Sequence, residues 1–148
     1  DRRVAVDLID STSLNIARST ANEMRLLIEK GLLEGQSVKE IANSLEKEFY
    51  FSRRRARRIA RTESTKAINV ASAQAYSTAQ AQGIRIRKEW LSSRDDKVRE
   101  THAKLDGDVV DANDDFRIGT YTAPSPAMFG EEAEDINCRC TIVPVIDE

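Results

Sequence analysis

Hydrophobic residues recur at helical spacing through the first third of the chain. Between Asp1 and Lys30 they stand three or four positions apart, which predicts a helix with one buried face that ends near Gly31 or Gly35. Ser37 and Glu40 have the spacing of a capping box, in which each side chain accepts a hydrogen bond from the backbone N–H of the other residue. The pattern therefore predicts a second helix that begins at Ser37.

A single long helix is predicted from Ser52 to Gly83. This stretch contains no proline and no internal glycine, and it begins and ends with residues that helices prefer at their starts and ends. It would be about 45 Å long, so another element should pack along it. The stripe expected to be buried is rich in alanine, with Ile68 and Tyr76 as its bulky members. It consists of Ile59 or Ala60, Ala67 or Ile68, Ala71, Ala75 and Ala79.

Beyond the long helix the spacing of the hydrophobic residues changes from a helical period to a period of two. Residues 84–90 alternate apolar and charged side chains, which predicts a half-buried strand. A short helical turn over residues 97–104 should carry His102, and Asp106 with Gly107 forms a turn dipeptide typical of tight hairpins. These signals indicate that the second half of the chain is built mainly from strands and turns.

The remaining pattern indicates short strands separated by long loops. Residues 116–118 predict a short strand, Pro124 and Pro126 mark an irregular loop, and Cys138 to Ile146 read as a final strand in which Pro144 favours an edge position. The predicted fold class is α+β. N-terminal helices, including one long helix, precede a small, mainly antiparallel sheet with long loops that packs on one side of the long helix.

Length and charge fit one compact domain with a helical extension. We divide the 148 residues into a helical lead-in, 1–51, and a domain, 52–148. The formal net charge of -2 argues against a generic nucleic-acid-binding protein. No apolar run has the length of a membrane span and no signal peptide is visible, so no membrane partner is expected. Because the chain begins at Asp1 without a methionine, we expect a processed product or a piece of a longer polypeptide.

An ordered set of short motifs spans the second half. They are Ala60-Arg61-Thr62-Glu63, Asn69 with Ala71, Gly83-Ile84, Glu89-Trp90, Asp95-Asp96 with Arg99, Thr101 and His102, Leu105-Asp106-Gly107, and Asn137-Cys138-Arg139-Cys140. In this order the chain resembles the phage Mu F-like head morphogenesis family of minor capsid proteins. The resemblance implies a structural protein of a tailed-phage head, associated with the portal and other capsid proteins. It also implies a place in the virion, assembly in the host cytoplasm and, for some members, contact with double-stranded DNA.

His102, Cys138 and Cys140 form a candidate metal site. Residues i and i+2 of a strand point to the same side, so both sulfurs can face one soft metal ion such as zinc, with Asp96, Asp106 or water as a fourth ligand. The resemblance favours this interpretation, since the family's histidine and Cys-x-Cys look like a metal site. Two alternatives remain open: ordinary packing of buried thiols beside a hydrogen-bonded histidine, and a disulfide closing a tight ring.

A cluster of arginines at the start of the long helix is a candidate DNA contact. Its members are Arg53, Arg54, Arg57 and Arg58. Binding through them would be non-specific and salt-dependent, because it rests on release of counterions from phosphates. The alternatives are a solvated face or pairing with the acidic loops around Asp114 and Glu132.

Arg61 and Glu63 stand where the charged start of the long helix meets its apolar stripe. Because buried charges are ordinarily paired, we expect a structural clasp in which they meet Asp96, Arg99 or Arg139 from the second half. The clasp would tie the helix to the sheet.

The sequence predicts a structural protein and no enzyme. The strongest enzymatic alternative is a metal-dependent hydrolase or nuclease that uses His102 with Asp95 and Asp96, but one histidine would then serve as either ligand or base. An arginine, a Ser-Thr-Ser run at 11–13 and Glu132-x-Glu134 have the order seen in arginine-type ADP-ribosyltransferases. We interpret that as coincidence, because the run has a helical context. A virion-packaging domain of a toxin-delivery protein is a further alternative.

Overall fold

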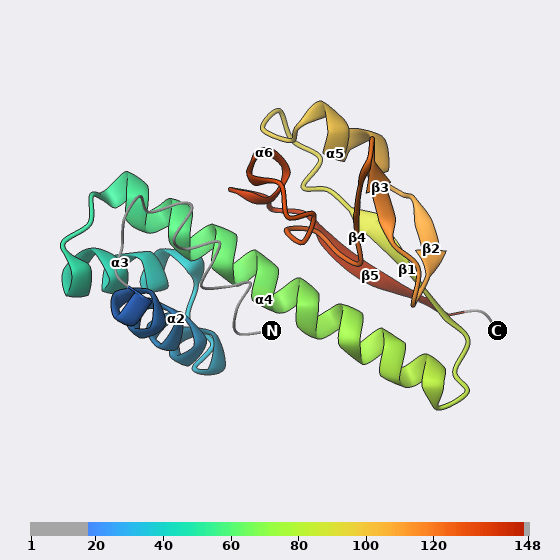
Figure 1. Ribbon diagram of the computed structural model, residues 1–148, viewed down its shortest axis with the longest axis horizontal. Helices are drawn as coiled ribbons and strands as arrows, with labels where there is room; N and C mark the ends of the chain where they lie inside the picture. The colour runs from blue at the N-terminus through green and yellow to red at the C-terminus, as the bar shows by residue number, and fades with distance from the viewer. Residues whose placement is uncertain (1–17, 147–148) are drawn as a thin grey trace. The chain divides into compact units, whose positions relative to one another are not determined.

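The computed structural model describes residues 18–146, and its long helices precede its strands. The elements are α2 (Arg18–Leu33), α3 (Val38–Phe49), α4 (Arg53–Ala81), β1 (Ile86–Leu91), α5 (Glu100–Leu105), β2 (Val109–Asp111), β3 (Phe116–Ile118), β4 (Tyr121–Ala123), α6 (Glu132–Asp135) and β5 (Thr141–Ile146) (Figure 1). This order confirms the α+β class. The part of the first predicted helix that precedes Arg18 lies outside the described residues.

The chain divides into two compact units, and the boundary falls between Ser64 and Thr65, inside α4. The boundary expected after residue 51 lies in the short connection that precedes α4. The long helix begins and ends as predicted, because the Ser52 hydroxyl accepts a hydrogen bond from the Arg55 backbone N–H and the backbone at Gly83 adopts a φ of +93°.

In the first unit, α2, α3 and the start of α4 share one apolar core. Its buried residues are Ala21, Met24, Ile28, Ile41, Ala42, Leu45, Ala56, Ile59 and Ala60. Gly31 lies inside α2, which continues to Leu33, and the turn that follows the helix contains Gly35, the later of the two predicted positions, where φ is +73°. A Cβ atom at Gly31 would stand 2.7 Å from Ile41 Cγ1, and glycine therefore permits the close approach of α2 to α3.

The predicted capping box at the start of α3 is confirmed. The Glu40 backbone N–H donates to Ser37 Oγ at 3.2 Å, and the Ser37 backbone N–H donates to Glu40 Oε2 at 2.7 Å. This second bond is the main reason why the pKa of Glu40 is lowered. The helix ends at Tyr50, which has a left-handed φ of 55°. Local side-chain chemistry thus sets the start of α3, and a left-handed backbone turn marks its end.

The second unit contains two small antiparallel sheets. One has the strand order β2-β1-β5, and the other is the β3-β4 hairpin. Trp90 lies opposite Ile142, and Lys88 lies opposite Pro144 on the edge strand, which confirms the edge position expected for that proline. The core is aromatic: the Trp90 ring packs against Phe116 and Phe129 at centroid separations of 5.2 and 6.0 Å. One tryptophan therefore organises the apolar interior of this unit.

Three predictions for this half need correction. The strand predicted from Cys138 begins at Thr141, so both cysteines precede β5. The Asp106-Gly107 turn joins α5 to β2 and not two strands. Strand β4 was not foreseen, because three residues are too few for a period of two to be recognised.

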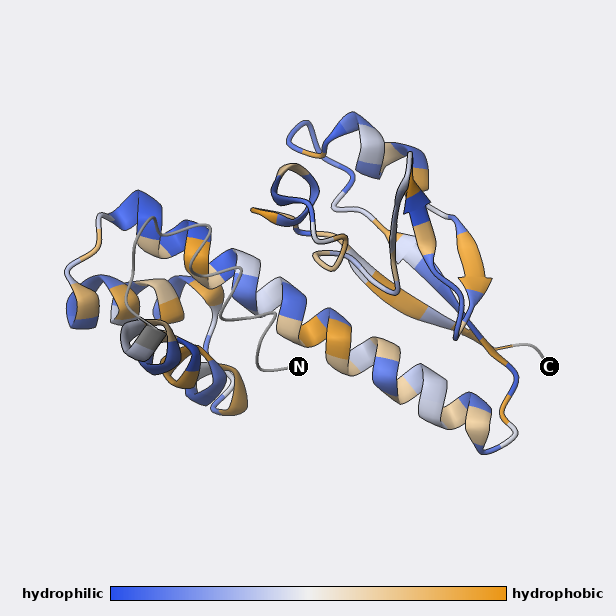
Figure 2. Ribbon diagram, in the orientation of Figure 1, coloured by the Kyte–Doolittle hydropathy of each residue, from blue (hydrophilic) through white to orange (hydrophobic). Residues whose placement is uncertain are grey.

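The buried face of α4 in the second unit is mostly polar: the predicted Tyr76 packs against the core, but Ala67, Ala71 and Ala75 of the predicted alanine stripe are exposed. Ile68 is 52% exposed and Ala71 is exposed, whereas Asn69 is buried. Figure 2 shows hydrophilic and hydrophobic segments mixed along α4. Thr65 Oγ1 donates to the Cys138 carbonyl at 2.9 Å and Asn69 Nδ2 to the Cys140 carbonyl at 3.0 Å. The buried face was mispredicted because the helix covers backbone acceptors of the segment that precedes β5, and these acceptors require donors.

Candidate metal centre

His102, Cys138 and Cys140 come together in the second unit. Their ligand atoms all lie within 4.8 Å of one another, and they form the only cluster of this kind found among the residues that the structure describes. His102 Nδ1 is 3.6 Å from Cys138 Sγ and 3.5 Å from Cys140 Sγ. The three residues predicted from sequence therefore converge on one point, and the cysteines are two free thiols, not a disulfide.

These separations fit a tetrahedral metal. With Zn–N near 2.0–2.1 Å and Zn–S near 2.3 Å, a tetrahedral angle places nitrogen and sulfur about 3.6 Å apart. A single Nδ1 proton could serve only one of two almost equidistant sulfurs as a linear hydrogen bond. Two soft sulfurs and one imidazole nitrogen are also the donor types that zinc prefers. The geometry and donor types of these three residues thus fit a zinc ion.

Helix α5 holds His102 and closes one side of the centre. The imidazole packs edge-on against Trp90 at a centroid separation of 5.4 Å, and its exposed fraction is 1%. Arg99, which precedes the helix, donates a hydrogen bond to the Ile136 carbonyl. The histidine is therefore fixed from α5, β1 and the segment that leads into the cysteines.

Helix α4 positions the two cysteines through their backbone. The carbonyls of Cys138 and Cys140 accept the hydrogen bonds from Thr65 and Asn69, which lie one turn apart on α4. Residues one helical turn apart are about 6 Å apart, close to the span of two extended residues. This match explains why both sulfurs face His102 although the segment precedes β5.

The two thiols have opposite pKa shifts. A hydrogen bond between the sulfurs raises the pKa of Cys138 and lowers that of Cys140, and burial raises the Cys138 pKa further. The nearby Trp90 indole N–H, the Arg99 charge and the Ser93 backbone N–H also lower the Cys140 pKa. Trp90 Nε1 itself is buried and makes no geometrically aligned hydrogen bond within the described chain. Cys140 is therefore the thiol that the site makes easier to deprotonate, and the thiolate is the form in which cysteine binds metal.

Glu134 of α6 also contacts the centre, and sequence reasoning did not assign it there. Its Oε2 is 3.0 Å from His102 Nε2 and accepts a hydrogen bond from Thr101 Oγ1 at 2.8 Å. The adjacent Asp135 holds α6 in place by accepting from the backbone N–H groups of Phe129 and Gly130. No regular spacing links residues 102 and 134, so no sequence signal could have paired them.

The proposed fourth ligands are placed elsewhere. Asp106 accepts from the Ser92 backbone N–H at 2.8 Å and pairs with Arg94 at 2.9 Å. Asp96 is exposed and is not part of the cluster in the described chain. The suggestion that either carboxylate completes the site is therefore not supported.

Arg139 pairs with Asp95, the neighbour of the predicted Asp96. Its two terminal nitrogens bind the Asp95 carboxylate at 2.6 and 2.7 Å, and this contact lowers the pKa of Asp95 to about 2. The clasp that was to include Arg61 and Glu63 stays a prediction, since those residues belong to the first compact unit and the pair belongs to the second.

The arginine cluster lies on the first turns of α4. Arg53, Arg54 and Arg57 are exposed, and Arg53 reaches Glu46 at 3.9 Å, a weak surface pair. Arg58 is half-buried and engaged in contacts. Three of the four arginines are thus exposed to solvent. Their role as a DNA contact stays a prediction.

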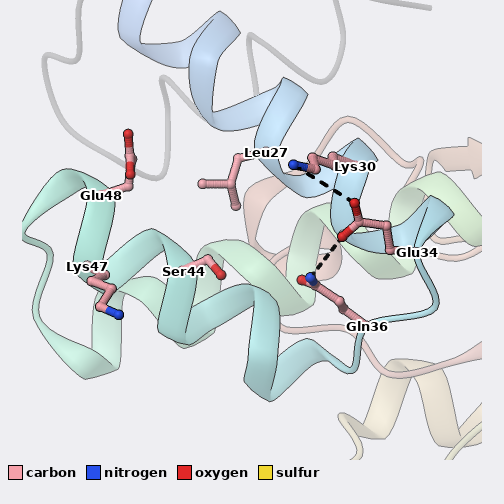
Figure 3. Close-up of a pocket in the computed structure, with 8 residues that line it drawn as sticks. Leu27, Lys30, Glu34, Gln36, Ser44, Lys47 and Glu48 are labelled. Carbon is pink, nitrogen blue, oxygen red and sulfur yellow. Dashed lines mark hydrogen bonds and ion pairs between the residues drawn. The ribbon is translucent and has the colours of Figure 1, made fainter.

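A hollow of about 270 Å³ lies between α2 and α3 in the first unit (Figure 3). Lys30 is 3.9 Å from Glu34, and Gln36 Nε2 donates to the same carboxylate at 3.1 Å. These polar groups pair with one another and are exposed. The hollow therefore offers no convergent set of groups for chemistry.

The chain matches the model of a known protein family. Residues 22–143 match the model of the family described as Phage Mu protein F like protein. The chain belongs to this family. The match begins inside α2, so the family's extent includes most of the described part of the region that we treated as a lead-in.

Curated relatives of this Mu F-like chain are longer. It is 44% identical over 117 residues to the NAD(+)–arginine ADP-ribosyltransferase EFV of Enterococcus faecalis. The aligned segment covers 79% of this chain and 24% of that protein. It is 30% identical over 127 residues to minor head protein GP7 of Bacillus phage SPP1, covering 85% and 41%. An uncharacterized protein of Bacillus subtilis, YqbB, is also 30% identical, covering 82% and 40%. No solved structure matches.

Proposed function

We propose that this chain is the Mu F-like part of a structural minor head protein of a tailed phage or prophage, with the portal and other capsid proteins as partners. The observation that carries the proposal is the family match over residues 22–143 together with the similarity to a minor head protein. The protein would be carried in the head interior and assembled in the host cytoplasm. Among the described helices, none combines the length and apolar character of a membrane span.

Particle composition tests this proposal. Peptides of this chain should co-sediment with purified, DNA-filled heads of the phage or prophage that encodes it, in fewer copies than the major capsid protein. Quantitative mass spectrometry across a density gradient measures this, with a host cytoplasmic enzyme as the control. Recovery only from the free-protein fractions would contradict the proposal.

A second candidate function is a packaging domain joined to an effector. The observation that favours it is the 44% identity to a segment that makes up 24% of an ADP-ribosyltransferase. The enzyme's name describes that whole protein. In this chain, Glu134 of the Glu132-x-Glu134 motif binds Thr101 and contacts His102, and residues 11–13 lie outside the described part. Heads containing a longer polypeptide with a fused effector would favour this candidate.

We further propose that the chain is not an enzyme and that its metal is structural zinc. Support comes from burial, since His102, Cys138 and Cys140 are 1%, 1% and 4% exposed and leave little access for a substrate. A bound ion would link α5 to the segment before β5. Small domains with limited cores commonly gain stability in this way. A hydrolase or nuclease built on His102 would need an accessible position beside the metal.

Non-specific binding to double-stranded DNA through the start of α4 is also proposed. Reversing the charge of Arg54 and Arg57 should make the plot of log K, the DNA association constant, against log salt less steep. The magnitude of its negative slope should fall by about two, because two phosphate contacts are lost. Fluorescence anisotropy on one DNA duplex between about 50 and 200 mM salt measures it. The matched control reverses Lys39 and Lys47, exposed residues of α3. Equal slopes for both variants and the wild type would place the contact elsewhere.

A further inference from the structure

The two nitrogens of His102 face different partners. Nδ1 lies almost equidistant from the two sulfurs, at 3.5 and 3.6 Å. Nε2 lies 3.0 Å from Glu134 Oε2. A neutral imidazole carries its proton on one nitrogen and keeps a lone pair on the other, so the surroundings of each nitrogen decide which one can bind a metal.

We infer that Glu134 is a positioning residue of the metal centre, which keeps the proton of His102 on Nε2 so that Nδ1 binds the ion. This inference rests on the metal site proposed above. A carboxylate accepts hydrogen bonds and donates none when ionised, so it requires a proton on the nitrogen that faces it. Metal-binding histidines ordinarily donate their second N–H to such an acceptor, which orients the ring and strengthens the ligand.

The contacts around Glu134 suit this role. Thr101 Oγ1 donates to the same Oε2 at 2.8 Å, so two consecutive residues of α5 meet one carboxylate of α6. His102 Nε2 is buried, and no described group makes an aligned hydrogen bond with it. Glu134 Oε2 nevertheless lies within hydrogen-bond distance of this nitrogen, at 3.0 Å, and is the acceptor that we assign to it.

Glu134 is not itself a ligand of the centre. Its carboxylate lies beside Nε2, whereas both sulfurs lie beside Nδ1, and the two ring nitrogens face opposite directions. It is also absent from the group whose ligand atoms lie within 4.8 Å of one another in the described chain. The carboxylate can thus act on the metal only through the imidazole.

The test uses zinc and the imidazole signals of the full 148-residue chain. His102 is the chain's one histidine, so a sample free of a histidine tag gives an unambiguous ¹⁵N spectrum. Zinc should shift the Nδ1 resonance and leave a proton on Nε2. Glu134→Gln should weaken zinc binding about tenfold and Glu134→Ala about 10- to 100-fold, as measured by chelator competition. The cobalt(II) spectrum should keep its sulfur-to-metal bands in both, because the ligands are unchanged.

Glu132→Gln and Glu132→Ala are the matched controls, since Glu132 is an exposed glutamate on the same helix. Zinc bound through Nε2, or equal affinity in the Glu134 and Glu132 variants, would overturn the inference while leaving the metal proposal intact. A wild-type chain that binds no zinc would overturn both. The Glu134→Gln variant keeps an acceptor for Thr101, so its effect is separable from misfolding of α6.

Discussion

His102→Ala should abolish zinc binding and lower the melting temperature of the second unit by about 15 °C or more relative to the zinc-loaded wild type. Free zinc at about 1,000 times the dissociation constant adds about 4 kcal/mol to a protein that binds it only when folded. A unit of this size loses about 4–8 °C per kcal/mol. The wild type treated with chelator should melt at a temperature close to that of the variant, because both lack the same link between α5 and the cysteines.

Calorimetry with and without zinc or chelator measures this effect. The matched control is Lys104→Ala, an exposed change on the same helix, which should keep the full zinc dependence. Cys138→Ser and Cys140→Ser should behave like His102→Ala, because each removes one ligand. A wild-type melting temperature that does not respond to zinc or chelator would contradict the structural metal and reduce these residues to packing.

Trp90→Ala should lower the free energy of unfolding by about 3–5 kcal/mol. The side chain is fully buried and contacts His102, Phe116 and Phe129, so its loss leaves a large cavity at the centre of the second unit. It also removes the ring that packs edge-on against the candidate ligand His102. Trp90→Ala should therefore weaken zinc binding as well as stability.

Urea unfolding followed by circular dichroism gives the free energy, since the variant loses the chain's one tryptophan and its fluorescence. Trp90→Phe is the control: it retains most of the apolar volume and should cost less than half as much. An equal loss for the two variants would show that the indole N–H, and not the buried volume, carries the effect.

Local chemistry made much of the fold readable from the sequence. The capping box of Ser37 and Glu40, the serine before Arg53 and the glycine at position 83 act within one or two turns, so their residue types are sufficient to predict helix ends. The period-two pattern likewise predicted β1, although Ile84 lies before the strand and is 48% exposed. Gly31 was ambiguous, because its role depends on contact with Ile41 from another helix.

The candidate site was predictable in its residues and not in its geometry. A histidine and a Cys-x-Cys pair are chemically distinctive, so their types singled them out. Their convergence depends on Thr65 and Asn69, which bind the cysteine carbonyls across more than 70 residues of sequence. Glutamates are common at surfaces, and nothing in the local sequence distinguishes Glu134 from Glu132.

The sequence by itself determined the α+β order, the start of α3 and both ends of α4, the Mu F-like family and the three residues of the candidate metal centre. Only the tertiary structure decided which face of α4 is buried, that Asp95 is the partner of Arg139, and that Glu134 faces His102. The physical reason is the separation along the sequence over which each interaction acts. Caps and periodicity act between neighbours in sequence, whereas a buried carbonyl or imidazole takes whichever partner the fold brings near.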